Sequence, residues 1–262
     1  MTSYQRLEYT VAAAVATITL TRVEARNSMD MVLKGELAEV IERAATDQAV
    51  RAVVVTGSGN AFCAGGDVSE MDLNTDPVTS RARLRTLLQT VYLPLAEMEK
   101  PTIAAVNGHC YGSGLSLMMA CDLVVAADDA LFSCAFVKVG LLPDCGAMYF
   151  LPRRLPMNVA KELIFTGRRF DAAEGKELGL VNRVVPAADL AKHVGELAAE
   201  LAAGPTVALG MAKTLLERSL LLGPRDFAEL EALAMGTIFS TEDHLAARKA
   251  FASKSTPEFK GR

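Results

Sequence analysis

The chain has 262 residues, of which 51% are apolar, and its formal net charge is −4. A chain of this length can bury a substantial hydrophobic core, so we expect one large domain, or one domain with a helical appendage. Nucleic-acid surfaces depend on clustered Lys and Arg, and the slightly acidic balance argues against such a partner. The charge still allows a local basic patch for a phosphorylated ligand.

The start of the chain, residues 1–6, lacks the apolar run of a signal peptide. The apolar run at residues 11–15 is far too short for a membrane span, which needs roughly 20 apolar residues. From these features we expect a cytoplasmic protein with no membrane partner.

The cysteines and histidines are scattered. No Cys-x-x-Cys pair occurs, and no His lies at metal-ligand spacing from a Cys. Such cysteines are typical of small core or loop residues in a reducing compartment. The sequence therefore predicts no metal site. The residues concerned are Cys63, Cys110, Cys121, Cys134 and Cys145, with His109, His193 and His244.

Short β-prone runs alternate with helical patterns through about residue 127. Helices are predicted at residues 30–45 and 81–98, and Pro94 is expected to kink or end the second. Strands separated by helices predict an α/β architecture with largely buried strands. The predicted strands, rich in Val, Ile, Ala and Thr, are residues 15–20, 52–56, 102–106 and 122–126.

From about residue 158 the pattern is mostly helical. One helix is predicted at residues 171–178, with Asp171 as N-cap and Gly179 as the stop. Gly-Pro pairs separate the later helices. We therefore expect a core at residues 1–200 and a C-terminal helical segment at residues 201–262. The later helices are predicted at residues 189–203, 206–222, 227–239 and 243–252.

Two glycine-rich turns follow predicted strands, at residues 56–67 and 106–114. Glycine allows the backbone to approach a ligand closely, and the N-terminus of a following helix favours an anion. Each turn taken alone is equally typical of an ordinary strand–helix connection. Neither matches a Walker loop, a Gly-x-Gly-x-x-Gly motif or a Gly-x-Ser-x-Gly elbow, which argues against nucleotide binding by those motifs and against serine hydrolysis.

Taken together, the segments resemble the enoyl-CoA hydratase/isomerase family, also called the crotonase family. The Ala-Phe-Cys-Ala-Gly-Gly-Asp stretch at residues 61–67 is similar to the first oxyanion segment of that family, and residues 100–123 are similar to the strand–turn–helix that carries the second. Val23 departs from the family pattern, which has proline there. Other matching segments are residues 22–28, 140–146, 151–153, 165–167, 179–184 and 251–261.

The resemblance implies a spiral of strand–strand–helix (ββα) units whose C-terminal helices pack in a homotrimer or hexamer. It implies an acyl-CoA substrate and no separate cofactor, because coenzyme A is part of the substrate. By position, the thioester oxygen would lie between the main-chain N–H groups of Ala64 and Ser113, although family members often have Gly where Ser113 stands. The resemblance also implies substrate contacts from Cys63, Gly66, Gly112, Ser116 and Phe136.

Hydration in this family uses two carboxylates, and by the motif landmarks both positions lack an acid here: Ser116 and Phe136 occupy them. One acid, Asp144, matches the Pro-Asp position of family members that move double bonds. We therefore expect Asp144 to act as a single base that moves a proton from C2 to C4 of a 3-enoyl-CoA. On the residues alone, Pro-Asp-x-Gly is also a good turn sequence.

Three alternatives remain at this point. The protein could instead be a hydratase, a ring-opening isomerase of a phenylacetyl-CoA epoxide, or a non-catalytic acyl-CoA-binding protein. Intact oxyanion turns together with Asp144 argue against the last.

Coenzyme A contacts are expected from Arg26, Phe251 and Lys254, the last two in some family members reaching a neighbouring subunit. Surface Lys and Arg are equally often only solvated. The polar stretch from Glu70 and Asp72 to residue 80 is a candidate edge of the acyl pocket. Structural roles are favoured for three other polar residues, namely Asp67 as a cap, Asp122 in a turn, and His109.

Overall fold

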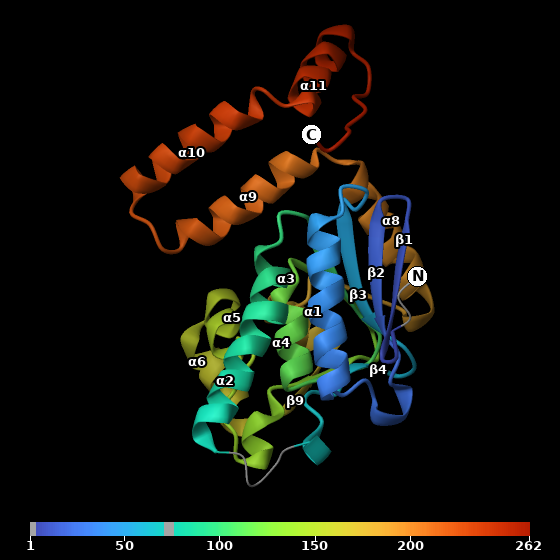
Figure 1. Ribbon diagram of the computed structural model, residues 1–262, viewed down its shortest axis with the longest axis vertical. Coiled ribbons are helices and arrows are strands. Elements are labelled where there is room, and N and C mark those ends of the chain that lie inside the picture. The colour runs from blue at the N-terminus through green and yellow to red at the C-terminus, as the bar shows by residue number, and fades with distance from the viewer. Residues whose placement is uncertain (1–3, 71–75) are drawn as a thin grey trace.

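The computed structural model describes residues 4–70 and 76–262, in which helices surround two β-sheets (Figure 1). The larger sheet has six strands, in the order β1-β2-β3-β5-β7-β10. β1 pairs antiparallel with β2, and all other neighbours are parallel. The strands are β1 (Leu7–Ala12), β2 (Val15–Leu20), β3 (Ala52–Gly57), β5 (Thr102–Val106), β7 (Leu123–Ala127) and β10 (Arg183–Val185).

The smaller sheet has four strands of three residues each, in the order β4-β6-β8-β9. Its last pair is antiparallel. Sequence analysis did not predict these strands, because three residues are too few for an alternating pattern to be recognised. They are β4 (Ala61–Cys63), β6 (His109–Tyr111), β8 (Leu131–Ser133) and β9 (Arg169–Asp171).

Three consecutive strand pairs share one plan. In β3-β4, β5-β6 and β7-β8, the first strand joins the large sheet, the second joins the small sheet, and a helical segment follows. Each repeat therefore adds one strand to both sheets. This confirms the α/β fold and the expected spiral of ββα units.

The first long helix, α1 (Met31–Thr46), begins where the sequence predicts it. Asp30 caps the helix, because its side chain accepts a hydrogen bond from the Leu33 N–H at 2.8 Å. One face of α1 is buried through Leu33, Leu37 and Ile41. Burial of each such side chain stabilises the fold by about 1.5–3 kcal/mol.

The predicted helix at residues 81–98 has an unexpected centre. It consists of α2 (Pro77–Leu87), a π-helical turn η3 (Leu88–Tyr92) and α3 (Leu93–Glu97). The Leu93 N–H donates to the Leu88 carbonyl, five residues back. Pro94 lies directly after this turn, in the first turn of α3, and it has no N–H to donate to a carbonyl of the preceding turn. The proline is therefore accommodated by a wider turn, and the helical path continues past it.

The central helix α4 (Ser113–Ala120) is buried along its whole length. Among the described residues, no helix combines the length and apolar content needed to cross a bilayer. Asp171 caps α7 (Ala172–Glu177) through the Glu174 N–H, as predicted. The other helical segments are α5 (Ala147–Arg154), α6 (Met157–Thr166), and the 3-10 turns η1 (Val23–Ala25), η2 (Val68–Glu70), η4 (Ala135–Val139) and η5 (Ala187–Asp189).

The C-terminal helices divide into two groups. Helix α8 (Leu190–Ala203) contacts β2, β3, β5 and β7 of the large sheet. The next three helices form an arm that extends beyond the sheets (Figure 1). We define this C-terminal arm as α9 (Thr206–Ser219), α10 (Pro224–Ile238) and α11 (Glu242–Ser253).

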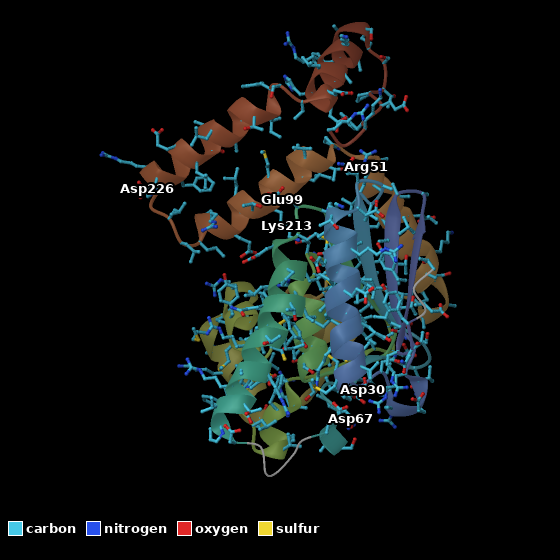
Figure 2. The ribbon with its side chains drawn as sticks, viewed as in Figure 1. Asp30, Arg51, Asp67, Glu99, Lys213 and Asp226 are labelled. Carbon is cyan, nitrogen blue, oxygen red and sulfur yellow. The ribbon has the colours of Figure 1, made fainter. Side chains whose placement is uncertain are left out.

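Two basic side chains join the C-terminal arm to the core, and both are labelled in Figure 2. The Arg51 guanidinium donates to the Gly204 carbonyl, to Thr206 Oγ1 at 2.9 Å and to the Phe259 carbonyl at 2.9 Å. Lys213 of α9 lies 3.0 Å from a carboxylate oxygen of Asp122. The first turn of the arm is therefore fixed, while α10 extends away from the sheets.

Candidate functional site

The two glycine turns lie against each other at the C-terminal ends of β4 and β6. A Cβ built on Gly65 would lie 3.0 Å from the Tyr111 carbonyl oxygen and 3.6 Å from the Ser113 nitrogen. Gly65 and Gly112 both have positive φ, of 104° and 52°, a conformation that residues with a side chain rarely adopt. Glycine at these two positions therefore permits the close approach of the two turns.

The first turn is held by the chain just before α1. Met29 forms a parallel bridge with Gly66, in which the Met29 N–H donates to the Gly65 carbonyl at 2.8 Å and the Asp67 N–H donates to the Met29 carbonyl at 3.2 Å. In this parallel bridge both hydrogen bonds are made by Met29 with the two neighbours of Gly66, so the N–H of Gly66 itself points away from Met29. That N–H has no protein acceptor among the described residues.

This pairing changes the expected first oxyanion donor. The Ala64 N–H already donates to the Arg26 carbonyl at 3.0 Å, so it is occupied. The Gly66 N–H, two residues later, is the unpaired donor of the turn. The geometry thus replaces Ala64 with Gly66. The sequence could not distinguish these two residues, because the acceptor of Ala64 comes from a segment about 40 residues earlier.

The second turn leads directly into α4. Ser113 is the first residue of this helix and is not among the residues with positive φ, so a side chain is accepted there. Its N–H belongs to the first helical turn and has no protein acceptor among the described residues. The positive end of the helix dipole adds to this donor. The unpaired N–H groups of Gly66 and Ser113 together form a candidate oxyanion site.

Cys63 was expected to contact substrate, but its side chain is fully buried behind the first turn. A Cβ built on Gly114 would lie 2.8 Å from the Cys63 Cβ, so β4 and α4 are in direct contact there. Burial raises the pKa of the Cys63 thiol to about 12. Cys63 therefore supports the turn from inside the core and offers no side chain to a ligand.

Asp144 lies in the loop between η4 and α5, which we call the acid loop (residues 140–146). Its carbonyl accepts the Ala147 N–H at 2.9 Å and the Ser116 hydroxyl at 3.1 Å. Its carboxylate does not cap α5, because the N-cap of that helix is Gly146 and no side chain caps it. The turn is thus made by the main chain, which leaves the carboxylate available for another role.

The surroundings of Asp144 favour a carboxyl group that holds its proton more tightly than usual. Burial raises its pKa above the ordinary value, while a hydrogen bond from the Cys145 thiol and the positive charge of Lys34 act in the opposite direction. A raised pKa brings a carboxylate closer to the range in which it exchanges protons efficiently.

Ser116 and Phe136, at the two positions where the family resemblance places hydratase acids, both lie near this site. The Ser116 side chain is fully buried, and its hydroxyl is bound to the main chain of the acid loop. The Phe136 ring lies 3.9 Å from a Cβ built on Gly112, so it borders the second turn. The structure therefore brings Asp144, Ser113, Ser116 and Phe136 together, as expected, with one carboxylate among them.

An ion cluster stabilises the segment between the first turn and α1. The Arg22 guanidinium donates to Asp67 and lies 3.5 Å from Asp30 (Figure 2 labels both acids). Asp67 also accepts from the Ser69 N–H and hydroxyl, at 2.9 and 2.7 Å. These Ser69 and Arg22 hydrogen bonds lower the pKa of Asp67 to about 2. Asp67 therefore caps the turn η2, in agreement with the predicted structural role.

The candidate edge of the acyl pocket is described only in part, because Asp72 lies outside the described residues. Glu70 accepts the Met31 N–H at 3.1 Å and lies 3.8 Å from the Lys34 ammonium. Two other polar residues have structural contacts. His109 Nδ1 lies 3.0 Å from the Tyr111 hydroxyl, and Asp122 accepts both the N–H and the hydroxyl of Thr102 at 2.8 Å.

The residues expected to contact coenzyme A are not brought together within one chain. Arg26 is exposed, next to the first turn, with a left-handed φ of 51°. Phe251, which is 89% exposed, and Lys254 lie at the end of α11. Figure 1 shows α11 at the opposite end of the molecule from β4. Any joint contact would require a second chain.

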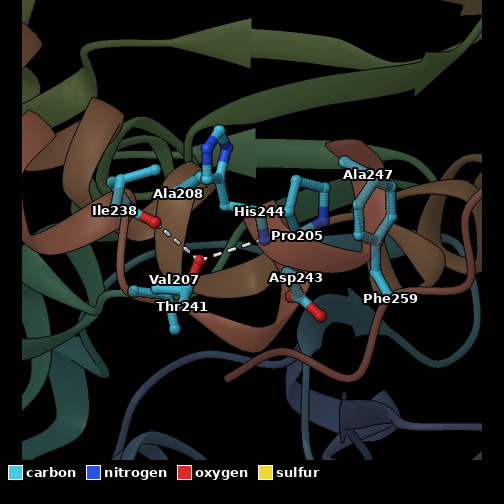
Figure 3. Close-up of a pocket in the computed structure, with 9 residues that line it drawn as sticks. All are labelled: Pro205, Val207, Ala208, Ile238, Thr241, Asp243, His244, Ala247 and Phe259. Carbon is cyan, nitrogen blue, oxygen red and sulfur yellow. Dashed lines mark hydrogen bonds between the residues drawn. The ribbon is translucent and has the colours of Figure 1, made fainter. Parts of the chain in front are cut away.

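Two hollows are present, and neither is lined by Gly66 or Ser113. A cavity of about 150 Å³ at the base of the arm is lined by apolar groups together with Thr241, Asp243 and His244 (Figure 3). There Thr241 Oγ1 donates to the Ile238 carbonyl and accepts the His244 N–H. Small-molecule sites usually have about 300–1,000 Å³, so this cavity is a packing gap at the hinge of the arm. A groove of about 600 Å³ lies along the contact of α8 with the large sheet, and Gly57, Gly59 and Asn107 of the two turn segments also line it.

Within residues 4–70 and 76–262, no three His, Cys, Asp or Glu side chains form a group that could hold a metal ion.

Comparisons with known proteins identify the family of the chain. The sequence model of enoyl-CoA hydratase/isomerase matches residues 10–262. A 1,2-epoxyphenylacetyl-CoA isomerase of Escherichia coli is 34% identical over 256 residues, which are 96% of this chain and 97% of the relative. A short-chain-enoyl-CoA hydratase of Clostridium acetobutylicum is 36% identical over 251 residues, 95% of each chain.

A crystal structure of an enoyl-CoA hydratase/isomerase from Cupriavidus metallidurans superposes with a TM-score of 0.93 at 34% identity. The match covers 100% of this chain and 98% of the other. The sequence match and the structural match therefore both extend over nearly the whole chain. The chain belongs to the enoyl-CoA hydratase/isomerase family of acyl-CoA enzymes.

Proposed function

We propose that the protein isomerises a 3-enoyl-CoA to the conjugated 2-enoyl-CoA, with Asp144 as its single base. The observation that carries this proposal is that one carboxylate, free of any capping role, lies on a loop bound to α4, the helix that begins at Ser113. The supporting electrostatic feature is burial of Asp144, which raises its pKa.

The reaction needs only one proton carrier. Asp144 takes a proton from C2, and the electrons of that C–H bond move into the thioester, placing negative charge on its oxygen. The N–H groups of Gly66 and Ser113 donate to that oxygen. Each such donor typically stabilises the transition state by about 3–4 kcal/mol. The protonated Asp144 then returns the proton to C4, and the double bond shifts into conjugation.

Hydration is less well supported, because both family acids would have to hold one water. Here Ser116 Oγ is bound to the Asp144 carbonyl at 3.1 Å, and Phe136 presents an apolar ring. The apolar side chains beside the acid, Leu141 and Leu142, are 41% and 66% exposed. These features favour an apolar acyl group over an ordered water at this position.

A second candidate is ring opening of an epoxide next to a phenylacetyl thioester. The observation that favours it is the E. coli epoxyphenylacetyl-CoA isomerase, which is 34% identical over 96% of this chain. In that reaction the thioester oxygen of the substrate would accept hydrogen bonds from the same two donors, the N–H groups of Gly66 and Ser113.

Product analysis separates these reactions. The purified protein is incubated with trans-3-hexenoyl-CoA and with crotonyl-CoA, and products are identified by mass and ultraviolet absorbance. We expect conversion of the first to a conjugated product of unchanged mass, with little water added to the second. Rapid formation of 3-hydroxybutyryl-CoA would contradict the proposal. Turnover of neither, with turnover of an epoxyphenylacetyl-CoA, would favour the second candidate.

The role of Asp144 is tested by Asp144→Asn, which keeps the size of the side chain and removes the base. We expect kcat to fall by about 10²–10⁴-fold, while acyl-CoA binding, measured by calorimetry, is retained. Unchanged turnover would exclude Asp144 as the base. Acyl-CoA binding without turnover by the wild-type protein on any of these substrates would favour a non-catalytic binding protein.

We also propose that the protein assembles as a homotrimer, or as a hexamer of two trimers, through the C-terminal arm. Large apolar side chains on the arm are exposed in the single chain, including Leu216 at 69%, Leu233 at 71% and Phe239 at 58%. Exposed apolar groups of this density are typical of interfaces. Such an assembly offers the route by which Phe251 and Lys254 of one chain reach coenzyme A bound near Arg26 of another.

A further inference from the structure

Helix α5 binds the C-terminal end of α4 through one arginine. The Arg154 guanidinium, in the last turn of α5, donates from a single nitrogen, Nη2, to the carbonyls of Met119 and Cys121, at 2.7 Å each. Met119 lies in the last turn of α4, and Cys121 is the cap residue of that helix. Because the last carbonyls of a helix have no partner within it, Arg154 supplies donors that α4 cannot provide.

This contact combines charge with hydrogen bonding. A cation at the C-terminus of a helix faces the negative end of the helix dipole. Hydrogen bonds from a charged donor are also stronger than bonds between neutral groups. Both acceptors are main-chain carbonyls, so the half-buried Arg154 fixes the backbone of α4 and not a side chain that could rotate away.

A second hydrogen bond joins the same two segments at the start of α5. The Ser116 hydroxyl of α4 donates to the Asp144 carbonyl at 3.1 Å, and that carbonyl also accepts the N–H of Ala147, the first residue of α5. Between the two points of attachment α5 buries Phe150 and Leu151, and the two helices are in contact. Helix α5 is therefore held on α4 both just before its first residue and at its last.

The attachment bears on the reaction because each helix carries one part of the site at its N-terminal end. Helix α4 begins with Ser113, whose N–H is the second oxyanion donor, and the acid loop with Asp144 leads into α5. A shift of α5 along α4 would change the separation of the carboxylate from that donor. Catalysis is sensitive to such shifts, since a misplacement of about 1 Å can cost about 10²-fold in rate.

We propose that Arg154 is a positioning residue: by binding the C-terminal carbonyls of α4, it fixes α5 on α4 and so sets the separation of the Asp144 carboxylate from the Ser113 N–H. This inference rests on the proposed role of Asp144 as base. Arg154 lies at the opposite end of α5 from the acid loop, so its effect reaches Asp144 through the helix.

The test is Arg154→Met, with Arg153→Met as matched control. Arg153 is adjacent and exposed, and its guanidinium contacts its own helix: it donates to the Tyr149 carbonyl at 3.0 Å and lies 3.4 Å from the centre of the Tyr149 ring. For Arg154→Met we expect kcat on the 3-enoyl-CoA to fall about tenfold with KM nearly unchanged, because the base moves while the coenzyme A contacts stay. Arg153→Met should match the wild type.

A conservative variant gives a graded comparison. Both hydrogen bonds of Arg154 come from one nitrogen, and an ammonium has donors enough for two carbonyls. The Lys side chain is shorter, so it keeps the charge but reaches the carbonyls less well. We therefore expect kcat of Arg154→Lys to lie between those of the wild type and Arg154→Met. If Arg154→Met does not fold, the comparison of Arg154→Lys with Arg153→Lys decides the same question.

A second measurement needs no turnover. Amide hydrogen exchange is followed by mass spectrometry in α4, in the acid loop and, as an internal reference, in β5. A positioning role predicts faster exchange at the end of α4 and in the acid loop of Arg154→Met, with β5 unchanged, whereas a residue that only stabilises the whole fold would change all three.

The outcomes separate this inference from the proposed reaction. Faster exchange confined to α4 and the acid loop supports the inference even if no tested acyl-CoA is converted by the wild type, a result that would remove only the proposed reaction. In an active enzyme, a kcat of Arg154→Met equal to that of the control would overturn the positioning role. Exchange that rises equally in β5, or that matches the control throughout, would also overturn it.

Discussion

The region around the glycine turns and the C-terminal arm differ in how far their apolar side chains are buried within the single chain. Around the turns, apolar side chains are buried, and hydrogen bonds from Ser116 and Tyr92 hold the loops in place. In the arm, Leu216, Leu233 and Phe239 are each more than half exposed. Helix α10 has no buried residue at all.

This difference indicates which part of the protein is complete in a single chain. The candidate oxyanion donors and Asp144 are supported entirely by residues of the same chain. The arm carries Phe251 and Lys254 far from those donors, and its apolar faces lack a cover in the single chain. Chemistry and assembly should therefore respond separately to substitutions in the two regions.

The largest expected effect is at Gly114, compared with Gly236. Both lie in helices, where Gly→Ala alone stabilises by about 1 kcal/mol. A Cβ on Gly114 would lie 2.2 Å from the Cys63 carbonyl, whereas a Cβ on Gly236 meets nothing within 4 Å. Gly114→Ala should destabilise by about 3 kcal/mol or more, and Gly236→Ala should be neutral or stabilising. Urea unfolding measures both, and equal effects would remove the contrast between the regions.

The next effect concerns assembly. Leu233→Glu places a charge on the exposed face of α10, and we expect the protein to dissociate to single chains in light scattering, while the fold by circular dichroism is retained. The control is Val78→Glu on α2. Val78 is 78% exposed and lies outside the arm, so this change should leave the mass unchanged. If Leu233→Glu leaves the mass unchanged, the arm is not the interface.

A smaller effect is expected where the two regions join. Arg51→Met removes the guanidinium that holds Gly204, Thr206 and Phe259. We expect a loss of roughly 2 kcal/mol in stability and faster hydrogen exchange at the start of α9. Arg225→Met, on the exposed first turn of α10, serves as comparison. Equal exchange in both variants would mean that Arg51 does not secure the arm.

The smallest effect is on the pH dependence of stability. Because burial raises the pKa of Asp144 in the folded chain, the folded state binds more protons than the unfolded state between the ordinary and the raised value. Stability therefore falls as pH rises through that window. Asp144→Asn should be more stable than wild type at neutral pH, and the difference should shrink as the pH falls through the raised pKa. A constant difference at all pH values would contradict this account.

Much of the fold could be predicted from the sequence, and the elements that were not predicted have physical reasons. The runs at residues 15–20 and 102–106 match β2 and β5 at both ends, because both are rich in the β-branched residues that strands favour. Pro94 was expected to kink or end its helix, and the helix does not end there, because α3 continues to Glu97. Proline removes one hydrogen bond of an α-helix, and the sequence gives no sign that a π-turn absorbs the loss.

The candidate site was accessible to a similar extent. Ser113 and Asp144 were named from their motifs, and the structure brings them to one site. Ala64 was preferred to Gly66 because the unpaired N–H depends on where Met29 and Arg26 bond. Tyr92 was not named, since a tyrosine within a helical pattern is ordinary core until the contacts of its hydroxyl with Met29 and Ser113 are seen.

The five cysteines are all buried and all lie before residue 146, so the arm contains none. Burial raises the pKa of Cys121 and of Cys134 to about 12, and only the thiolate reacts with alkylating reagents. Thiol labelling of the native protein is therefore slow, and each labelling event marks an opening of the core. Because the arm carries no thiol, the labelling rate reports on opening of the core, whereas subunit exchange reports on the arm.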